Sequence, residues 1–274
     1  MLEIGIVETK SIIKAIAEKY LYDFSDYALT SFKQRLERSI ELHNIKYFDI
    51  FQNKLLEDKI FFETFLSELE VPSTEMFRDP SLWRIFREEL IPDILKDSGA
   101  CLRIWLPNSV SGDELFSLCI MLHEMKLLDQ VKIYVSALSQ RSLDVIQSGY
   151  FQNGKLSIST DNYIRANGKM GLSDYYTTVK GEIFRDKSLI KDVIFSLQSV
   201  IPEPMAQPIK LVLYRNKMIY FNQTLESKVL RCFEQNLNAG AHLIIGTKET
   251  ISNIYGNSEF NLVNNSESIY RRKG

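Results

Sequence analysis

Short apolar runs alternate with helical stretches along the second half of the chain, and this alternation limits the fold more than any other feature. Five runs have the length of buried strands: CLRIWL (101–106), VKIYVSAL (131–138), DVIFSL (192–197), IKLVLY (209–214) and AHLIIG (241–246). Helical patterns occupy about 113–128, 139–148 and 222–237. Buried strands that alternate with amphipathic helices predict an α/β fold, in which helices cover both faces of a mostly parallel sheet.

Two further segments of this half have a different pattern. The end of the chain, FNLVNNSESIYRR, predicts two short strands around Asn264 and Asn265, so we expect an antiparallel hairpin at one side of the sheet. The segment at about 150–190 is polar and rich in tyrosine. Its alternating stretches, 175–180 and 182–185, predict a β insert with a small hairpin rather than another crossover helix.

The first part of the chain has helical periodicity instead. Between about 9 and 70 apolar residues return every three or four positions, which predicts a small all-helical domain over 1–70. Lys33, Arg35 and Arg38 lie among acidic residues in this domain, and we expect them on a solvated face. Pro72 and Pro80 interrupt any continuous helix. We therefore expect a linker over 71–80 and a sheet domain over 81–274.

Composition excludes several classes of protein. The 33 basic and 35 acidic side chains nearly balance, so no global charge favours nucleic acid. Cys101, Cys119 and Cys232 are odd in number and far apart, which indicates reduced thiols in a cytoplasmic protein. Cys119 and His123 share a predicted helix face, but no third ligand is evident, so no metal site is expected. No segment has the roughly 18 apolar residues of a membrane span.

Four motifs together resemble one family, the CheR-type S-adenosylmethionine-dependent methyltransferases of bacterial chemotaxis receptors. They are STEMFRDPSLW (73–83), SGDE (111–114), YRNKMIYFN (214–222) and GTKE (246–249), and RNxxIYF is the most specific of them. The resemblance covers nearly the whole chain. It implies a Rossmann-like methyltransferase sheet behind a small helical domain, with S-adenosylmethionine as cofactor. The implied partner is the cytoplasmic region of a chemoreceptor or another signalling protein, without nucleic acid or membrane insertion.

The resemblance also implies roles for individual residues. Arg78 and Tyr220 match catalytic positions of the family. Cofactor-binding positions match Thr74, Gly112, Glu114, Arg215 and Asn216. Transfer of a methyl group to an ionised glutamate needs alignment rather than a general base. The residues themselves leave alternatives open, because Arg78 could pair within the linker, Glu114 could serve the helix dipole, and Tyr220 could be a core aromatic.

Several positions depart from the family pattern on the cofactor side. Pro107 and Asn108 stand in a loop where the family has small residues, and Pro72 and Ser199 stand where it has asparagine. Ala137 ends the second strand, where the family has an aspartate that binds the ribose hydroxyls. Hydrogen bonds to a charged group contribute about 1.5–3 kcal/mol each, so their loss would weaken binding roughly tenfold to a hundredfold. We therefore expect cofactor binding to be weakened or lost.

Two classes of function follow from these motifs. The first is a protein-glutamate O-methyltransferase with a partly degraded cofactor site. The second is a catalytically inactive CheR-like module that binds a signalling protein. The retained motifs favour the enzyme, and the departures favour the module.

Overall fold

The structure is a computed structural model that describes residues 3–69, 75–97, 102–203, 205–251 and 259–274. Its α-helices are α1 (Ile6–Tyr20), α2 (Leu29–Leu42), α3 (Phe48–Glu57), α4 (Lys59–Leu69), α5 (Pro80–Ile85), α6 (Ile91–Asp97), α7 (Asp113–Glu124), α8 (Gln140–Ser148), α9 (Leu156–Arg165) and α10 (Gln223–Asn236). A π-helical turn, Phe86–Leu90, joins α5 to α6. The strands are β1 (Leu102–Leu106), β2 (Val131–Ala137), β3 (Tyr150–Phe151), β4 (Tyr176–Val179), β5 (Glu182–Arg185), β6 (Ile194–Leu197), β7 (Ile209–Tyr214), β8 (Leu237–Ile245), β9 (Phe260–Asn264) and β10 (Ile269–Arg272).

Seven strands form the main sheet, in the order β6-β2-β1-β7-β8-β10-β9. The strands from β6 to β8 are parallel, whereas β10 runs antiparallel to both β8 and β9. The predicted α/β fold and its antiparallel final hairpin are thus confirmed. The chain winds from β1 toward β6 on one side and from β7 toward β9 on the other. The strand order therefore reverses between β1 and β7, and such a reversal opens a crevice at the carboxyl ends of the strands.

Alternate side chains of the central strands belong to different cores. Ile104 and Leu106 of β1 join α7 and the insert on one face, while Trp105 joins α10 and the helical segment on the other. Strand β7 alternates in the same way, because side chains of a strand point to opposite faces in turn. Burial on both faces explains why these strands are nearly continuous apolar runs.

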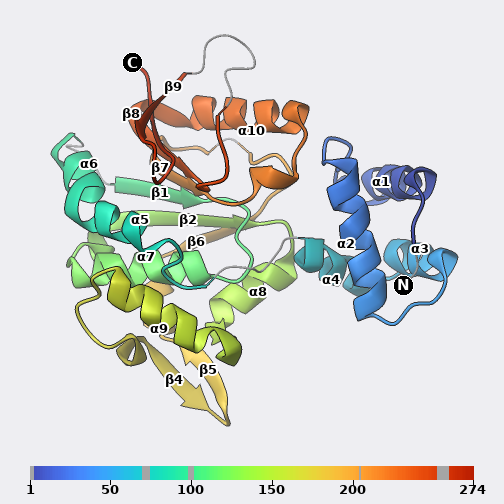
Figure 1. Ribbon diagram of the computed structural model, residues 1–274, viewed down its shortest axis with the longest axis horizontal. Coiled ribbons are helices and arrows are strands. Elements are labelled where there is room, and N and C mark those ends of the chain that lie inside the picture. Colours follow the sequence, from blue (N-terminus) through green and yellow to red (C-terminus); the bar gives the residue numbers. More distant parts are fainter. Residues whose placement is uncertain (1–2, 70–74, 98–101, 204, 252–258) are drawn as a thin grey trace.

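Helices α1 to α4 lie beside the carboxyl ends of the parallel strands (Figure 1). Their apolar stripes share one core with α10 and the adjoining face of the sheet. Backbone hydrogen bonds connect the two parts: the amide of Ala28 donates to Tyr220 (2.9 Å), and that of Asn222 donates to Asp26 (3.0 Å). The helical segment therefore packs against the crevice. The boundary proposed near residue 70 falls in residues 70–74, outside the described part of the chain.

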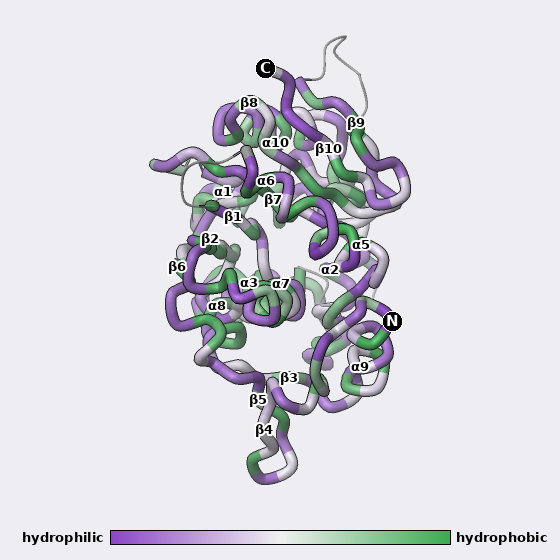
Figure 2. Tube along the Cα trace, turned by 90° about the vertical axis from the view of Figure 1, so that its left-hand side faces the viewer, coloured by the Kyte–Doolittle hydropathy of each residue, from purple (hydrophilic) through white to green (hydrophobic). Residues whose placement is uncertain are grey.

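The insert between β2 and β6 contains more than the predicted hairpin. Strands β4 and β5 form that hairpin and β3 pairs with β5, so the hairpin prediction is confirmed. Figure 2 shows it projecting from one end of the molecule. The expectation of no further helix was wrong, since α9 spans ten residues of the insert. Its buried residues are Ser159, Asn162 and Tyr163, so the helix has no apolar stripe that the sequence would reveal.

Candidate active site

A cavity of about 220 Å³ lies at the carboxyl ends of β1 and β7, where the strand order reverses. Its lining comes from the segment before α5, Trp83 of α5, the loop between β1 and α7, the loop after β7, Lys248, and Tyr27 and Leu69 of the helical segment. Six of the residues predicted for the site line it together: Arg78, Gly112, Glu114, Arg215, Asn216 and Tyr220. Thr74, the seventh, lies outside the described residues.

Arg215 follows β7 and is held between two carboxylates. One terminal nitrogen lies 3.1 Å from Oε1 of Glu114, and the other pairs with Asp79. The arginine side chain is 4% exposed, and the two carboxylates are partly exposed. Arg215 therefore joins the segment before α5 to the first turn of α7. Glu114 faces a cation here as well as the helix dipole, so the dipole is not its only favourable interaction.

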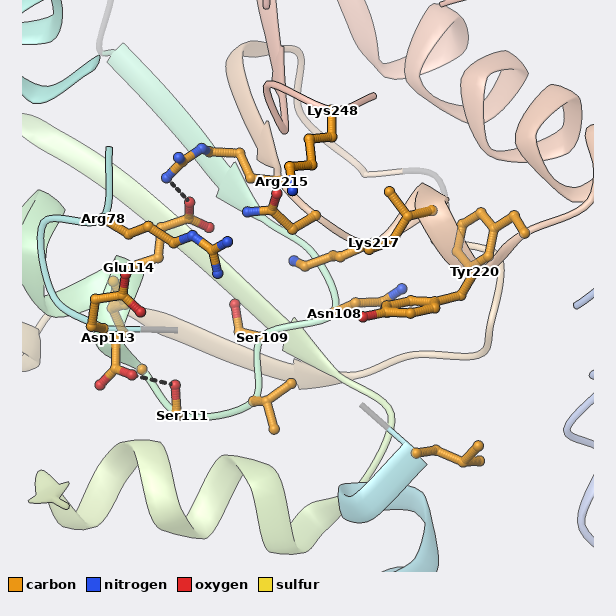
Figure 3. Close-up of a pocket in the computed structure, with 18 of the residues that line it drawn as sticks. Arg78, Asn108, Ser109, Ser111, Asp113, Glu114, Arg215, Lys217, Tyr220 and Lys248 are labelled. Atoms are coloured by element: carbon orange, nitrogen blue, oxygen red, sulfur yellow. Dashed lines mark hydrogen bonds and ion pairs between the residues drawn. The ribbon is translucent and has the colours of Figure 1, made fainter. Parts of the chain in front are cut away.

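Basic side chains converge on the cavity. Figure 3 shows Arg78 and Lys217 directed toward one another, with Lys248 approaching from a third side. Lys217 Nζ also donates to the carbonyl of Pro107 and lies 5.0 Å from the ring centroid of Tyr214. A concave site with several cations favours an anionic group such as a carboxylate. Carboxylates also line the cavity, so it offers cations for a carboxylate and acceptors for an ammonium group.

Glu249 connects two loops at the edge of the cavity, and the sequence did not single it out. Its buried carboxylate accepts hydrogen bonds from the amides of Asn216 (2.9 Å), Gly246 (2.6 Å), Met218 (2.7 Å) and Ile219 (3.3 Å). A Cβ at position 246 would lie 2.4 Å from Oδ1 of Asn216, so only glycine allows this approach. The GTKE motif contains both the glycine and the glutamate, and that spacing was the available signal.

Arg185, at the end of β5, fastens the insert to the loop that borders the cavity. Its guanidinium is 2% exposed and lies 2.8 Å from the buried Asp113 carboxylate. It also donates to the carbonyls of Ser111 (2.7 Å) and Tyr150 (2.5 Å). Burial lowers the pKa of Arg185, and the neighbouring Asp113 opposes that shift. Sequence reasoning missed this pair, because nothing in the insert distinguishes this arginine from surface ones.

Tyr220 contacts the helical segment through Arg35 of α2. The guanidinium carbon of Arg35 lies 4.0 Å from the ring centroid of Tyr220, and Arg35 also donates to the carbonyl of Leu69. Burial lowers the pKa of Arg35, so the expectation of a solvated face was wrong for this residue. Tyr220 is half-buried and lines the cavity, and the next residue, Phe221, lines it as well while its ring belongs to the core.

The end of β2 is closed off from this cavity. Ala137 has 0% exposure and is not among the lining residues. Its carbonyl accepts from the amide of Gln198 (3.0 Å), and the carbonyl of the next residue, Leu138, accepts from the hydroxyl of Tyr22 (2.7 Å). Asn108 does line the cavity, in a left-handed conformation that asparagine tolerates (φ 53°).

Comparison with known proteins decides the family. Residues 72–268 match the family described as CheR methyltransferase, SAM binding domain. The chain belongs to the CheR methyltransferases. It is 30% identical over 271 residues to a putative methyltransferase Cher3 of Pseudomonas putida, and these residues are 97% of this chain and 97% of the relative.

Further CheR relatives carry a chemotaxis name. A chemotaxis protein methyltransferase of Listeria innocua is 24% identical over 231 residues, which are 84% of this chain and 85% of the relative. Chemotaxis protein methyltransferase 1 of Vibrio cholerae is 26% identical over 213 residues, which are 73% and 72% of the two chains. Because the matched domain is a SAM-binding domain, S-adenosylmethionine is the cofactor of this CheR fold.

The cavity fits one half of that cofactor better than the other. Its cations suit the α-carboxylate of the methionyl half, and Glu114 offers an acceptor for the α-ammonium. The ribose half would extend toward the end of β2, where a carboxylate commonly binds the sugar hydroxyls in such sheets, but Ala137 offers a methyl group. The volume of about 220 Å³ is also below the roughly 300–1,000 Å³ of most small-molecule sites.

Two other findings bear on expectations from the sequence. Among the described residues, no cluster of three or more His, Cys, Asp or Glu side chains could hold a metal ion. Within the same residues, no helix combines the length and the apolar character needed to cross a membrane. Cys119 is fully buried, and that burial raises the pKa of its thiol.

Proposed function

We propose that this CheR protein is an S-adenosylmethionine-dependent protein-glutamate O-methyltransferase, with a cofactor site that is weakened on its ribose side. The supporting observation is the single cavity that gathers Arg78, Glu114, Arg215, Asn216 and Tyr220 at the strand-order reversal. The proposed substrate is a glutamate in the cytoplasmic region of a chemoreceptor or of another signalling protein, as the names of the chemotaxis relatives suggest. We place the reaction in the cytoplasm.

When bound, the cofactor supplies an electrophilic methyl group, and the residues of the chain provide alignment. The acceptor glutamate is already ionised at neutral pH, so no side chain has to remove a proton. Arg78 points into the cavity and orients the acceptor carboxylate through charge-assisted hydrogen bonds (Figure 3). Glu114 would hold the cofactor's ammonium, and Arg215 fixes the position of Glu114. Tyr220, held by Arg35, lines the same cavity and would border the methyl group of the bound cofactor.

One observation favours the inactive binding module as a second candidate. The closed end of β2 leaves no exposed group at Ala137 for the sugar hydroxyls. A protein that keeps the reaction-side residues and the packed helical segment could still bind its partner without turnover. In that case the fold persists because it shapes a docking surface.

Transfer of a labelled methyl group tests the proposal. The protein is incubated with tritiated S-adenosylmethionine and receptor cytoplasmic fragments, and base-labile methanol release reports glutamate esters. We expect the wild type to give labelled methanol and Arg78→Met to give about a hundredfold less, because the contact that orients the acceptor carboxylate is lost. Arg84→Met is the matched control on the neighbouring helix, where the arginine binds the carbonyl of Arg165 away from the cavity. Capture of the fragments without any label would support the binding module instead.

A further inference from the structure

Buried polar groups form a continuous chain between the cavity and the end of β2. Trp105 Nε1 donates to Ser136 Oγ (3.2 Å), and Ser136 Oγ donates to Oε1 of Gln198. The Nε2 of Gln198 donates to Oδ1 of Asn108, whose Nδ2 donates to the hydroxyl of Tyr214 (3.0 Å). All five side chains are buried. The chain therefore crosses β2, β1 and β7 at their carboxyl ends.

Gln198 is the member that separates the cavity from β2. It follows β6 directly, and its backbone N–H donates a hydrogen bond to the carbonyl of Ala137 (3.0 Å). Gln198 is 6% exposed, and its side chain reaches Asn108, which lines the cavity. Gln198 itself does not line the cavity, and neither do Ser136 and Ala137 of β2. The side chain thus lies between the cavity and the strand end where a nucleoside ligand of such a sheet places its ribose.

We infer that Gln198, hydrogen-bonded to Asn108 and Ser136, is a closure of the ribose subsite, and that it lowers the affinity of this protein for adenosyl ligands. This inference rests on the proposed function and adds the residues that regulate its cofactor site. The closure is neutral, and both ends of the amide are satisfied, so the closed form is stable without a ligand. A ribose can enter only when these two hydrogen bonds are exchanged for bonds to the sugar.

The closure also explains what a single restored acid would do. An aspartate at position 137 would be enclosed behind Gln198, where no sugar hydroxyl reaches it. Its charge would then be buried without a partner, which is unfavourable. Ala137→Asp, which restores the acid, and Gln198→Ala, which opens the subsite, should therefore act together. Their combined gain in affinity for an adenosyl ligand should exceed the sum of the two separate gains.

Calorimetric binding of S-adenosylhomocysteine to five forms of the full chain, the wild type and four variants, tests the closure. Gln198→Ala should bind about tenfold more tightly than the wild type, because the side chain that fills the ribose subsite is gone together with the two hydrogen bonds that hold it there. Gln198→Met, the matched control, keeps the length of the side chain and should bind no better than the wild type. Ala137→Asp alone should show no gain, whereas Ala137→Asp with Gln198→Ala should gain about a further tenfold.

The outcomes separate the closure from the proposed function. If the wild type binds and a folded Gln198→Ala binds equally well, the closure is wrong while the cofactor assignment stands. If the wild type and every opened variant fail to bind, both are wrong. Should Gln198→Ala not fold, Gln198→Ser and the wild type supply the test. Saturating ligand should then shift the side-chain amide NMR resonances of Gln198 in the wild type, and unchanged resonances despite binding would overturn the closure.

Discussion

The two sides of the cavity are built from different chemistry. On the β7 side, charged groups hold the loops: Arg215 lies between Glu114 and Asp79, and Glu249 collects four backbone amides. On the β2 side, neutral amides and hydroxyls form the chain in which Gln198 joins Ser136 to Asn108. Charged side chains that are held in place by ion pairs are preorganised for a charged ligand. The neutral groups of the β2 side already hydrogen-bond to one another, so they need no ligand to complete their bonding. The β7 side is therefore arranged around charged groups, whereas the β2 side is complete without them.

This comparison makes a prediction about relative energies. Removing a charged side chain on the β7 side leaves several groups without a hydrogen-bond partner, so the free energy of unfolding should fall by a large amount. Removing one neutral partner on the β2 side leaves a single group beside the cavity, where water can replace the bond. The following substitutions test this order, from the largest expected effect to the smallest.

Glu249→Ala should have the largest effect. The substitution removes the acceptor of four backbone amides, and each buried N–H without an acceptor costs about 1–3 kcal/mol. We expect the free energy of unfolding in urea to fall by at least about 3 kcal/mol. The exposed neighbour Lys248→Ala is the control and should change it by less than about 0.5 kcal/mol. A loss below about 1 kcal/mol for Glu249→Ala would show that charge does not organise this side.

Arg215→Met should come next. It leaves Glu114 and Asp79 without their shared cation, but both carboxylates are partly exposed, which reduces the cost. We expect a loss of about 2 kcal/mol in unfolding free energy, within the range for hydrogen bonds to charged groups. Arg215→Lys keeps the charge and loses the two-pronged geometry, so it should retain part of the stability. Equal losses in the two variants would mean that geometry alone matters.

Much of the fold could be predicted because the pattern that gives it is local. LRIWL and the other central strands are buried on both faces, so their apolar runs are continuous. Helix α9 was missed for the opposite reason, since Ser159 and Asn162 are among its buried residues. Local pattern therefore identifies an element only when its buried face is apolar.

The site was predictable only as far as its motifs reach. Arg78, Glu114, Arg215 and Tyr220, which the motifs contain, line one cavity. Their partners were not predictable, because Arg215 pairs with Asp79 136 residues away and Gln198 bonds Asn108 90 residues away. Such pairings depend on how the sheet and the preceding segments pack, and spacing along the chain does not encode them.

Arg35→Met tests how the helical segment supports the β7 side. The guanidinium of Arg35 stacks on Tyr220, and a desolvated contact of this kind contributes about 2 kcal/mol. We expect unfolding free energy to fall by about 1–2 kcal/mol and methyl transfer by about tenfold, with S-adenosylhomocysteine affinity unchanged. Arg35→Lys keeps the charge without the planar stack and should recover only part of the rate. A change confined to cofactor affinity would contradict a positioning role.

Tyr214→Phe should have the smallest effect, and it addresses the neutral chain, whose last member is this tyrosine at the end of β7. The substitution removes the hydroxyl that accepts from Nδ2 of Asn108 (3.0 Å) and leaves the buried ring in place. Since Asn108 borders the cavity, water can take over the lost bond, and we expect a loss of about 0.5–1.5 kcal/mol in urea denaturation. The ring can still face Lys217, so that contact does not add to the loss. If Tyr214→Phe costs more than Arg215→Met, the neutral chain rather than the charged groups holds the carboxyl ends of the strands together.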